Sequence, residues 1–405
     1  MMRDLALEFV RLGHQVTVVT PSDSVNGALK ITLEGGVTLV QVKTGSLRGA
    51  NNFLRMWREG RLSSTIWRAA HKFFHANPCD LIVFYSPTIF FGRLVARLKS
   101  LWHCPSYLIL RDIFPKWAVD TGLLKKGWIY RYLKRKELAQ YAASDIIGVE
   151  APGNLGYFSQ ETQNGEYRVE VLHNWLDAQW PPKTDGHWRS KLGLNNKVIF
   201  VFGGNIGKAQ DMDNIVRLAS GLQHQQEISF LLVGSGAEVQ RIVEQINKQN
   251  IGNIVVLPSL PQGDYLQCIA ECDVGMISLD RRLKSHNVPG KVLGYVQCGL
   301  PILASVNPGN NLVDLLHQAG AGIACINGED DELRCGALQL ATRPEVRRLM
   351  GRNARGLADT TFSVRVIAGQ ILSHFGPQAG DEKNMLNQSS RPGTSDVRPT
   401  PATAS

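Results

Sequence analysis

The stretch VIFVFGGNIGKAQ, from Val198 to Gln210, places residue types that bind anions directly after an apolar run. Residues 198–202 are apolar and partly β-branched, which predicts a buried parallel strand that breaks at Gly203. Apolar residues at helical spacing follow. A strand that enters a helix through a glycine turn leaves N–H groups unpaired at the positive end of the helix dipole. With Lys208 beside it, the turn is predicted to bind a phosphate or diphosphate. The alternative is a turn that only reverses the chain.

A second lysine, Lys291, lies in the segment SHNVPGKVLGYVQCGLPILAS, residues 285–305. The pattern predicts a loop over 285–290, a helix over 291–298 and a strand over 301–304. The start of a helix disfavours a cation, so we interpret Lys291 as a ligand for an anion. A lysine that only faces solvent is the alternative.

The elements around these residues alternate between strand and helix. The apolar runs Ile228 to Val233, Ile254 to Leu257 and Val274 to Ile277 predict further strands, with an amphipathic helix after the first. This alternation predicts a doubly wound parallel sheet. Ligands of such sheets bind at the carboxyl ends of the strands, so the glycine turn, Pro258 and Lys291 should border one crevice.

The first half of the chain alternates as well, so the predicted fold class is α/β, with two doubly wound, Rossmann-like domains facing each other across a cleft. A stretch rich in Pro, Gly and polar residues separates the two halves. Two such domains suit a transferase, because closure over donor and acceptor excludes water. The predicted organisation is an N-terminal domain over 1–177, a linker over 178–190, a C-terminal domain over 191–362, a helix over 363–375 and a disordered tail over 376–405.

The composition is that of a globular protein, with 405 residues, of which 43% are apolar and 20% charged. No stretch comes near the roughly eighteen apolar residues of a transmembrane helix. Charges at Asp4 and Glu8 argue against a signal peptide. The seven cysteines are scattered, and Cys268 and Cys272 lack the further ligands of a metal site. We expect core thiols, no metal and a reducing, cytoplasmic compartment.

The net charge of +9 is concentrated in the first half, where residues 1–180 hold 22 Lys and Arg against 15 Asp and Glu. Much of the surplus lies in KKGWIYRYLKRKE, from Lys125 to Glu137, where three aromatic residues alternate with basic ones. This mixture is typical of a segment that binds an anionic membrane surface. A solvated helix face whose aromatics pack inward is the alternative. Nucleic acid is disfavoured, because no nucleic-acid module accompanies the charge.

Several segments resemble a known family. FGGNIGKAQ, LLVGSGAE, VLPSLPQGDYLQCIAECDVGMISL and VPGKVLGYVQCGLPILAS are similar, in order and spacing, to the carboxyl-terminal domain of retaining GT-B glycosyltransferases of family four. VRLGHQVTVVT, YLILRDIFPKWAVDTGLL and VLHNWLD resemble that family's acceptor domain and hinge. The resemblance covers residues 1–375. NVPGK and LRDIFP are most similar to bacterial transferases of N-acetyl-L-fucosamine in O-antigen or capsule synthesis.

The resemblance implies a retaining hexosyltransferase that uses a nucleotide-diphosphate sugar, expected to be a UDP-sugar, without metal or other cofactor. Catalysis would rest on preorganised donors that stabilise the charge of the leaving phosphate, which can itself accept the acceptor's proton. The implied catalytic residues are Lys208, Lys291 and Asp112, the last facing the sugar from the opposite domain unless it only pairs with Arg111. The implied donor-binding residues are Gly204, Asn205 and Gln210 near the diphosphate, Leu257 and Pro258 at the base, and Asn287 and Gly290 around the sugar and phosphates.

The sequence departs from the family at three places. His286 and Gly294 occupy the positions of two glutamates that many relatives carry, and Asn205 and Gln210 those of a basic pair in others. The family's first strand and glycine-rich loop are expected to be missing before the helix that opens this chain.

The implied acceptor is a polyprenyl-diphosphate-linked saccharide, used at the inner face of the cytoplasmic membrane by a peripheral enzyme of bacterial lipopolysaccharide (O-antigen) or capsule synthesis. Two alternatives stay open: a nucleotide-sugar epimerase of the same fold and an inactive, truncated transferase.

Overall fold

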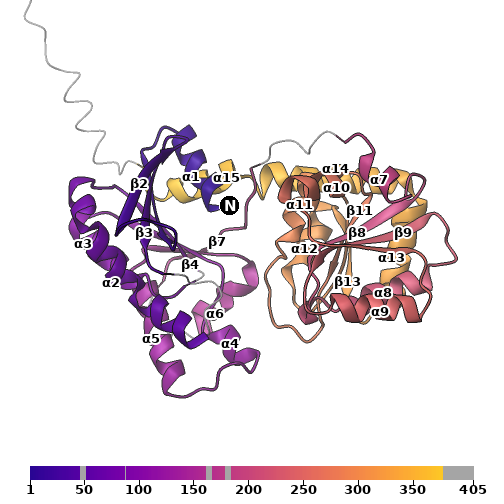
Figure 1. Cartoon of the computed structure of the whole chain (residues 1–405), viewed down its shortest axis with the longest axis horizontal. Coiled ribbons are helices and arrows are strands. Elements are labelled where there is room, and N and C mark those ends of the chain that lie inside the picture. Colours follow the sequence, from indigo (N-terminus) through magenta and orange to yellow (C-terminus); the bar gives the residue numbers. More distant parts are fainter. Residues whose placement is uncertain (46–51, 87, 161–166, 178–183, 377–405) are drawn as a thin grey trace, which may run out of the picture.

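The computed structural model describes residues 1–45, 52–86, 88–160, 167–177 and 184–376, and only the backbone of 52–57 and 160. Figure 1 shows two α/β lobes, one built from the first half of the chain and one from the second. The predicted fold class, α/β with two domains containing parallel sheets, is confirmed. Of the predicted linker and tail, residues 178–183 and 377–405 lie outside the described residues.

The C-terminal lobe is built on one parallel sheet of six strands in the order β10-β9-β8-β11-β12-β13. The strands are β8 (Val198–Asn205), β9 (Ile228–Ser235), β10 (Ile254–Leu257), β11 (Val274–Ser278), β12 (Ile302–Val306) and β13 (Gly322–Ile326). The helices of the second half are α7 (His187–Lys191), α8 (Met212–Gly221), α9 (Val239–Lys248), α10 (Gln262–Ala270), α11 (Lys291–Gln297), α12 (Asn311–Ala319), α13 (Asp330–Thr342), α14 (Pro344–Thr360) and α15 (Val364–Ser373).

Strand β8 is buried on both faces, which explains its continuous apolar run. Phe200 and Phe202 pack against the core formed with α8, α9 and α13. Ile199 and Val201 face the opposite core, formed with α10, α11, α12 and α14. The strand therefore holds helices on both sides of the sheet, including α11, which begins at Lys291.

The end of β8 differs from the prediction. The strand does not break at Gly203 but continues to Asn205, with Gly204 opposite Gly234 and Asn205 opposite Ser235. Gly234 permits this extension, because a Cβ there would lie 1.8 Å from the carbonyl oxygen of Gly204. Gly203 therefore continues the strand, and the close approach of the two strands lies one residue later, between Gly204 and Gly234.

The N-terminal lobe contains two sheets. One has the order β1-β3-β2, with β2 antiparallel, and the other is parallel, with the order β4-β5-β6-β7. The strands are β1 (Val16–Ser22), β2 (Leu29–Glu34), β3 (Val37–Lys43), β4 (Ile82–Ser86), β5 (Ser106–Leu110), β6 (Ile146–Val149) and β7 (Val169–Val171). The helices are α1 (Met2–Arg11), α2 (Asn52–Ala76), α3 (Gly92–Trp102), α4 (Lys116–Asp120), α5 (Trp128–Ala142) and α6 (Leu155–Gln160).

The last helix, α15, crosses back to the N-terminal lobe and packs beside α1 (Figure 1). Its apolar residues Ile367 and Ile371 share a core with Leu5 and Phe9 of α1. The amide of Gln370 donates to the carbonyl oxygen of Val171 at 2.8 Å. The chain therefore joins the lobes twice.

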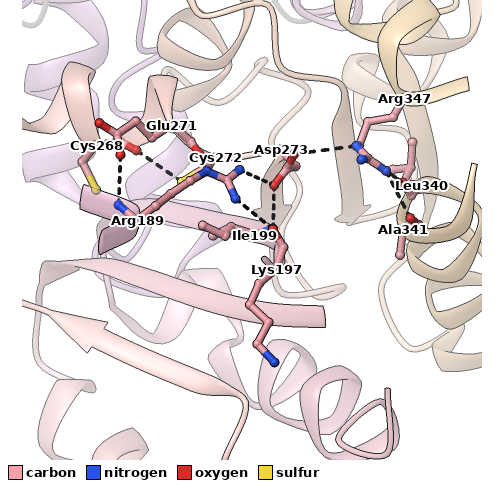
Figure 2. A network of polar contacts seen from close by, with 10 residues as sticks. All are labelled: Arg189, Lys197, Ile199, Cys268, Glu271, Cys272, Asp273, Leu340, Ala341 and Arg347. Carbon is pink, nitrogen blue, oxygen red and sulfur yellow. Dashed lines mark hydrogen bonds and ion pairs between the residues drawn. The ribbon is translucent and has the colours of Figure 1, made fainter. Parts of the chain in front are cut away.

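The amino ends of β8 and β11 are tied together by a polar network (Figure 2). Arg189 of α7 donates to the carbonyl oxygens of Glu271 and Lys197, at 2.6 and 2.9 Å, and pairs with Asp273 at 2.6 Å. Asp273 also accepts from the backbone N–H of Ile199 at 2.9 Å. The network leaves the opposite, carboxyl edge of the sheet for ligands.

Candidate functional site

The carboxyl ends of β8 and β9 meet the turn that carries Lys208. Gly204 has a φ of +109°, a conformation open to glycine but strained for other residues. Two predicted polar groups contact each other: the amide of Asn205 donates to Oε1 of Gln210 at 3.1 Å, and so does the N–H of Gly207 at 3.2 Å. Gln210 thus shapes this turn from within.

Lys291 lies beside this turn with its side chain largely buried. Its Nζ is 3.7 Å from the centre of the Phe202 ring, and its Cε is 3.7 Å from where a Cβ on Gly204 would be. No hydrogen bond or ion pair of its ammonium group occurs among the described residues. Burial lowers the pKa of Lys291 to about 7. A buried ammonium group without a counter-ion favours the binding of an anion next to it.

Tyr295, on the next turn of α11, fixes the position of Lys291. Its ring is fully buried beneath the strands, and a Cβ on Gly275 would lie 2.4 Å from it. The hydroxyl accepts from the N–H of Gly203 at 2.9 Å and lies 3.2 Å from the carbonyl oxygens of Val201 and Met276. The N–H of Gly203 is therefore bonded within the protein.

Lys208 differs from Lys291 in its surroundings. It lies on a 3₁₀ turn, Lys208–Gln210, and its side chain is exposed. The ammonium group of Lys208 makes no ion pair within the described part of the chain. An exposed ammonium group stays hydrated, so it attracts an anion more weakly than Lys291 does.

Leu257 and Pro258 border a hollow of about 620 Å³ between α9 and β10. Gly234, Ser235 and Gly236 line it too, while Val239 and Val243 contribute its apolar wall. The hollow therefore brings the predicted base-binding residues beside the end of β9.

The loop before α11 is held within its own lobe by two buried asparagines. Asn307 donates to the carbonyl oxygen of Ser285 at 3.0 Å, and Asn310 to that of Asn287 at 3.3 Å. The side chain of Asn287 points across the cleft. Gly290, which precedes α11, is exposed.

Across the cleft, Asp112 follows strand β5 and is exposed, and partial desolvation raises the pKa of its carboxyl group. The adjacent Arg111 is buried and donates to the carbonyl oxygens of Leu172 and His173, at 2.6 and 3.2 Å. An ion pair between Arg111 and Asp112 does not occur among the described residues. Asp112 therefore remains available to a ligand.

Sequence reasoning missed Glu150, which follows strand β6 in the same way that Asp112 follows β5. Only 7% of Glu150 is exposed, and burial raises the pKa of its carboxyl group to about 7. It lies near His173, whose pKa burial lowers. The rule that ligands bind at the carboxyl ends of strands would have singled it out.

The basic segment predicted to bind membranes forms α5 and the loop before it. Leu123, Trp128 and Tyr132 are exposed there, at 75, 78 and 44%, and Trp117 of the preceding helix α4 is exposed at 43%. Lys134 turns inward, where it pairs with the buried Glu137 at 2.9 Å.

The sequence predicts neither a metal site nor a transmembrane helix. No group of three or more His, Cys, Asp or Glu able to hold a metal occurs among the described residues. Within the same part of the chain, no helix is both long and apolar enough to cross a membrane.

Comparison with known families matches both halves of the chain. Residues 185–357 match the family described as Glycosyl transferases group 1. Residues 1–147 match the one described as Glycosyl transferase 4-like domain. The two matches fall on the C-terminal and N-terminal lobes.

Two bacterial proteins are similar in sequence. The chain is 26% identical to the probable glycosyltransferase WbjE of Pseudomonas aeruginosa, over 54% of this chain and 55% of that protein. It is 23% identical to WcaI of Escherichia coli, a putative colanic acid biosynthesis glycosyl transferase, over 73% of both. The alignment thus spans only about half the length of WbjE.

Solved structures share the two-lobed fold at low identity. Sucrose-phosphate synthase of Thermosynechococcus elongatus matches with a TM-score of 0.68 and 15% identity, covering 96% of this chain and 93% of that one. WaaG, a glycosyltransferase involved in lipopolysaccharide biosynthesis, matches with a TM-score of 0.64 and 16% identity, covering 93 and 95%. Anabaena HepE in complex with UDP matches at 0.62 and 15%, covering 84 and 86%.

Proposed function

We propose that this chain transfers a sugar from a nucleotide-diphosphate donor, because both of its lobes match glycosyltransferase families and the chain has the GT-B fold. The observation that carries the proposal is the ammonium group of the half-buried Lys291, which lies beside Gly204 and has no ion pair among the described residues. A diphosphate placed there would supply the missing counter-charge. A UDP donor is supported by HepE, which has the same fold and was solved with UDP and with UDP-glucose.

The chemical role of Lys291 follows from its position. Negative charge grows on the leaving phosphate as the bond to the sugar breaks, and a preorganised donor stabilises it most in a desolvated site. Lys291 fits this role. The backbone of Gly204, which is close in space, and that of Gly290, which directly precedes Lys291, would assist it, and the exposed Lys208 would contribute more weakly. The proposed reaction retains the configuration at the anomeric carbon, as the sequence resemblance implies, and needs no metal, since these cations take the metal's place. Asp112 orients the sugar or acceptor from the other lobe.

The proposed acceptor is a lipid-linked saccharide of bacterial surface polysaccharide synthesis, in keeping with the roles named for WcaI and WaaG. The resemblance of NVPGK and LRDIFP makes N-acetyl-L-fucosamine the first donor sugar to test. The exposed aromatic residues beside Lys125, Lys126 and Arg131 would hold the enzyme at the inner face of the cytoplasmic membrane.

Calorimetry with UDP and a panel of UDP-sugars tests donor binding, and incubation with lipid extract tests transfer. We expect heat with UDP, and transfer of label to lipid. Release of a free epimer would instead favour the epimerase. Binding of no sugar nucleotide would contradict the proposal.

A further inference from the structure

We propose that Asn287 and Glu150 form a clasp between the two lobes, which holds the 285–291 loop, and with it Lys291, against the N-terminal lobe. The contact between Asn287 and Glu150 would stabilise the closed arrangement of the lobes, which is a property separate from the proposed sugar transfer.

The side chain of Asn287 uses its polar atoms on the opposite lobe. Its Nδ2 donates to the carbonyl oxygen of Arg111 at 3.2 Å and to Oε2 of Glu150 at 3.0 Å. Its Oδ1 accepts from Nδ2 of Asn154 at 2.7 Å. Both hydrogens of the amide and its oxygen are thus bonded to residues of the N-terminal lobe.

The loop can transmit this contact, because its backbone is held at Ser285 and at Asn287 itself. The buried Asn310 holds the carbonyl oxygen of Asn287, and the buried Asn307 holds that of Ser285. Lys291 lies four residues farther on, at the start of α11. Movement of Asn287 relative to the N-terminal lobe therefore moves the segment that carries Lys291.

A second set of contacts lies beside the clasp. The N–H of Gly153 donates to Oδ1 of Asn311 at 3.0 Å. A Cβ on Gly153 would lie 2.4 Å from Cγ of His286, so a side chain there would push the lobes apart. The lobes thus meet through close backbone packing as well as through Asn287.

Glu150 is the charged member of the clasp, and its carboxylate is compensated by amides. Its Oε1 accepts from Nδ2 of Asn174 at 2.5 Å, while Oε2 accepts from Asn287. The nearby guanidinium group of Arg111 bonds to carbonyl oxygens instead. The space that Glu150 shares with Gly290 and neighbouring residues is too small for a water molecule.

The burial of Glu150 couples closure of the lobes to the uptake of a proton. In the closed arrangement the pKa of Glu150 is about 7, and separation of the lobes would hydrate the carboxyl group and return its pKa toward 4.5. The closed state then binds the proton more tightly, so closure is favoured as the pH falls from 7 toward 4.5 and weakens as the pH rises through that range.

Other titratable groups face the same region and need to be separated from Glu150. They are Tyr85, Arg111, Asp112 and His173 from the N-terminal lobe and His286 from the loop. Burial lowers the pKa of His173, so its release of a proton on closure acts in the opposite direction. A neutral variant of Glu150 therefore isolates the contribution of Glu150 to the pH dependence of closure.

Two measurements on the full chain without donor test the clasp between pH 5 and 8. Small-angle X-ray scattering reports the separation of the lobes, and hydrogen–deuterium exchange reports the protection of residues 285–291. Asn287→Asp, which sets two carboxylates against each other, should raise exchange of the loop by about tenfold or more and enlarge the radius of gyration. Asn154→Ala, which keeps the contact with Glu150, should have a smaller effect.

Two further variants make the test specific. Glu150→Gln should remove the pH dependence of the radius, whereas Glu345→Gln, on the exposed first turn of α14, should leave it unchanged. Glu150→Gln combined with Asn287→Asp exchanges donor and acceptor and should recover part of the lost protection. The clasp is refuted if Asn287→Asp leaves exchange and radius at the wild-type values, or if Glu150→Gln retains the wild-type pH dependence. Failure to bind UDP is measured separately and would affect only the proposed transfer.

Discussion

The ammonium nitrogen of Lys291 lies 3.7 Å from the centre of the Phe202 ring, at the carboxyl edge of the six-stranded sheet. The ring face is negative, so it partly compensates a charge that no carboxylate balances among the described residues. The aromatic ring is fully buried and belongs to the core. The C-terminal lobe therefore places the poorly hydrated ammonium group of Lys291 at this edge of the sheet.

Replacement of Lys291 by Met should separate function from stability. We expect the transfer rate to fall about 100-fold or more, as for loss of a preorganised donor in other active sites. The free energy of unfolding should rise, because the variant no longer desolvates an unpaired amine. Steady-state transfer and denaturant unfolding measure the two effects. Lys208→Met is the matched control, and a loss equal to that of Lys291→Met would contradict the different roles.

The pKa of Lys291 predicts how UDP affinity depends on pH. An anion favours the protonated amine, so above pH 7 binding must take up a proton, and the Kd should rise by up to about tenfold per pH unit. Without ligand, the sign for folding is opposite: stability should increase from about pH 7 toward the amine's ordinary pKa of 10.5. Calorimetry in buffers of different ionisation enthalpy measures the proton uptake. Lys291→Arg, which stays charged, should show a flat profile over this range.

Gly203 should not tolerate a side chain. A Cβ there would lie 2.1 Å from Oη of Tyr265, in a buried region, so Gly203→Ala should lower the free energy of unfolding by about 1–3 kcal/mol. Gly263→Ala, in helix α10 with open space around the added carbon, should be neutral or stabilising. Equal stability of the two variants in chemical denaturation would argue against the close contact.

Liposome binding should depend on the exposed residues of the loop before α5 and of its first turn rather than on the whole basic segment. Replacing Leu123 and Trp128 by Ser, or neutralising Lys125 and Lys126, should weaken flotation with anionic vesicles. Lys134→Met should instead reduce stability, because it leaves the buried Glu137 without its cation. Vesicle binding that falls only with Lys134→Met would reverse this assignment.

Arg189 should matter for stability and not for the donor. Arg189→Met removes three side-chain hydrogen bonds at the amino ends of the strands (Figure 2), and the free energy of unfolding should fall by about 2 kcal/mol. Because the network lies opposite the candidate site, the Kd for UDP should stay within twofold of the wild type. A large change in Kd in a folded variant would connect the two edges of the sheet.

The sequence alone determined the α/β class and the two lobes, because strand and helix periodicity are local. The buried strands at 228–233, 254–257 and 274–277 were predicted within one or two residues of their ends. It also singled out Lys291, since a lysine is out of place at the start of a helix. Local patterns carried these predictions because each depends on residues close together in the chain.

Tertiary structure decided what those residues contact. The glycines at 203 and 204 turned out to extend a strand, because Gly234 and Tyr295, far away in sequence, approach them. The contact between Asn287 and Glu150 was invisible in the sequence, because the two residues lie in different lobes, more than 130 residues apart. Burial and pairing across the cleft are properties of the whole fold, so no spacing of residue types encodes them.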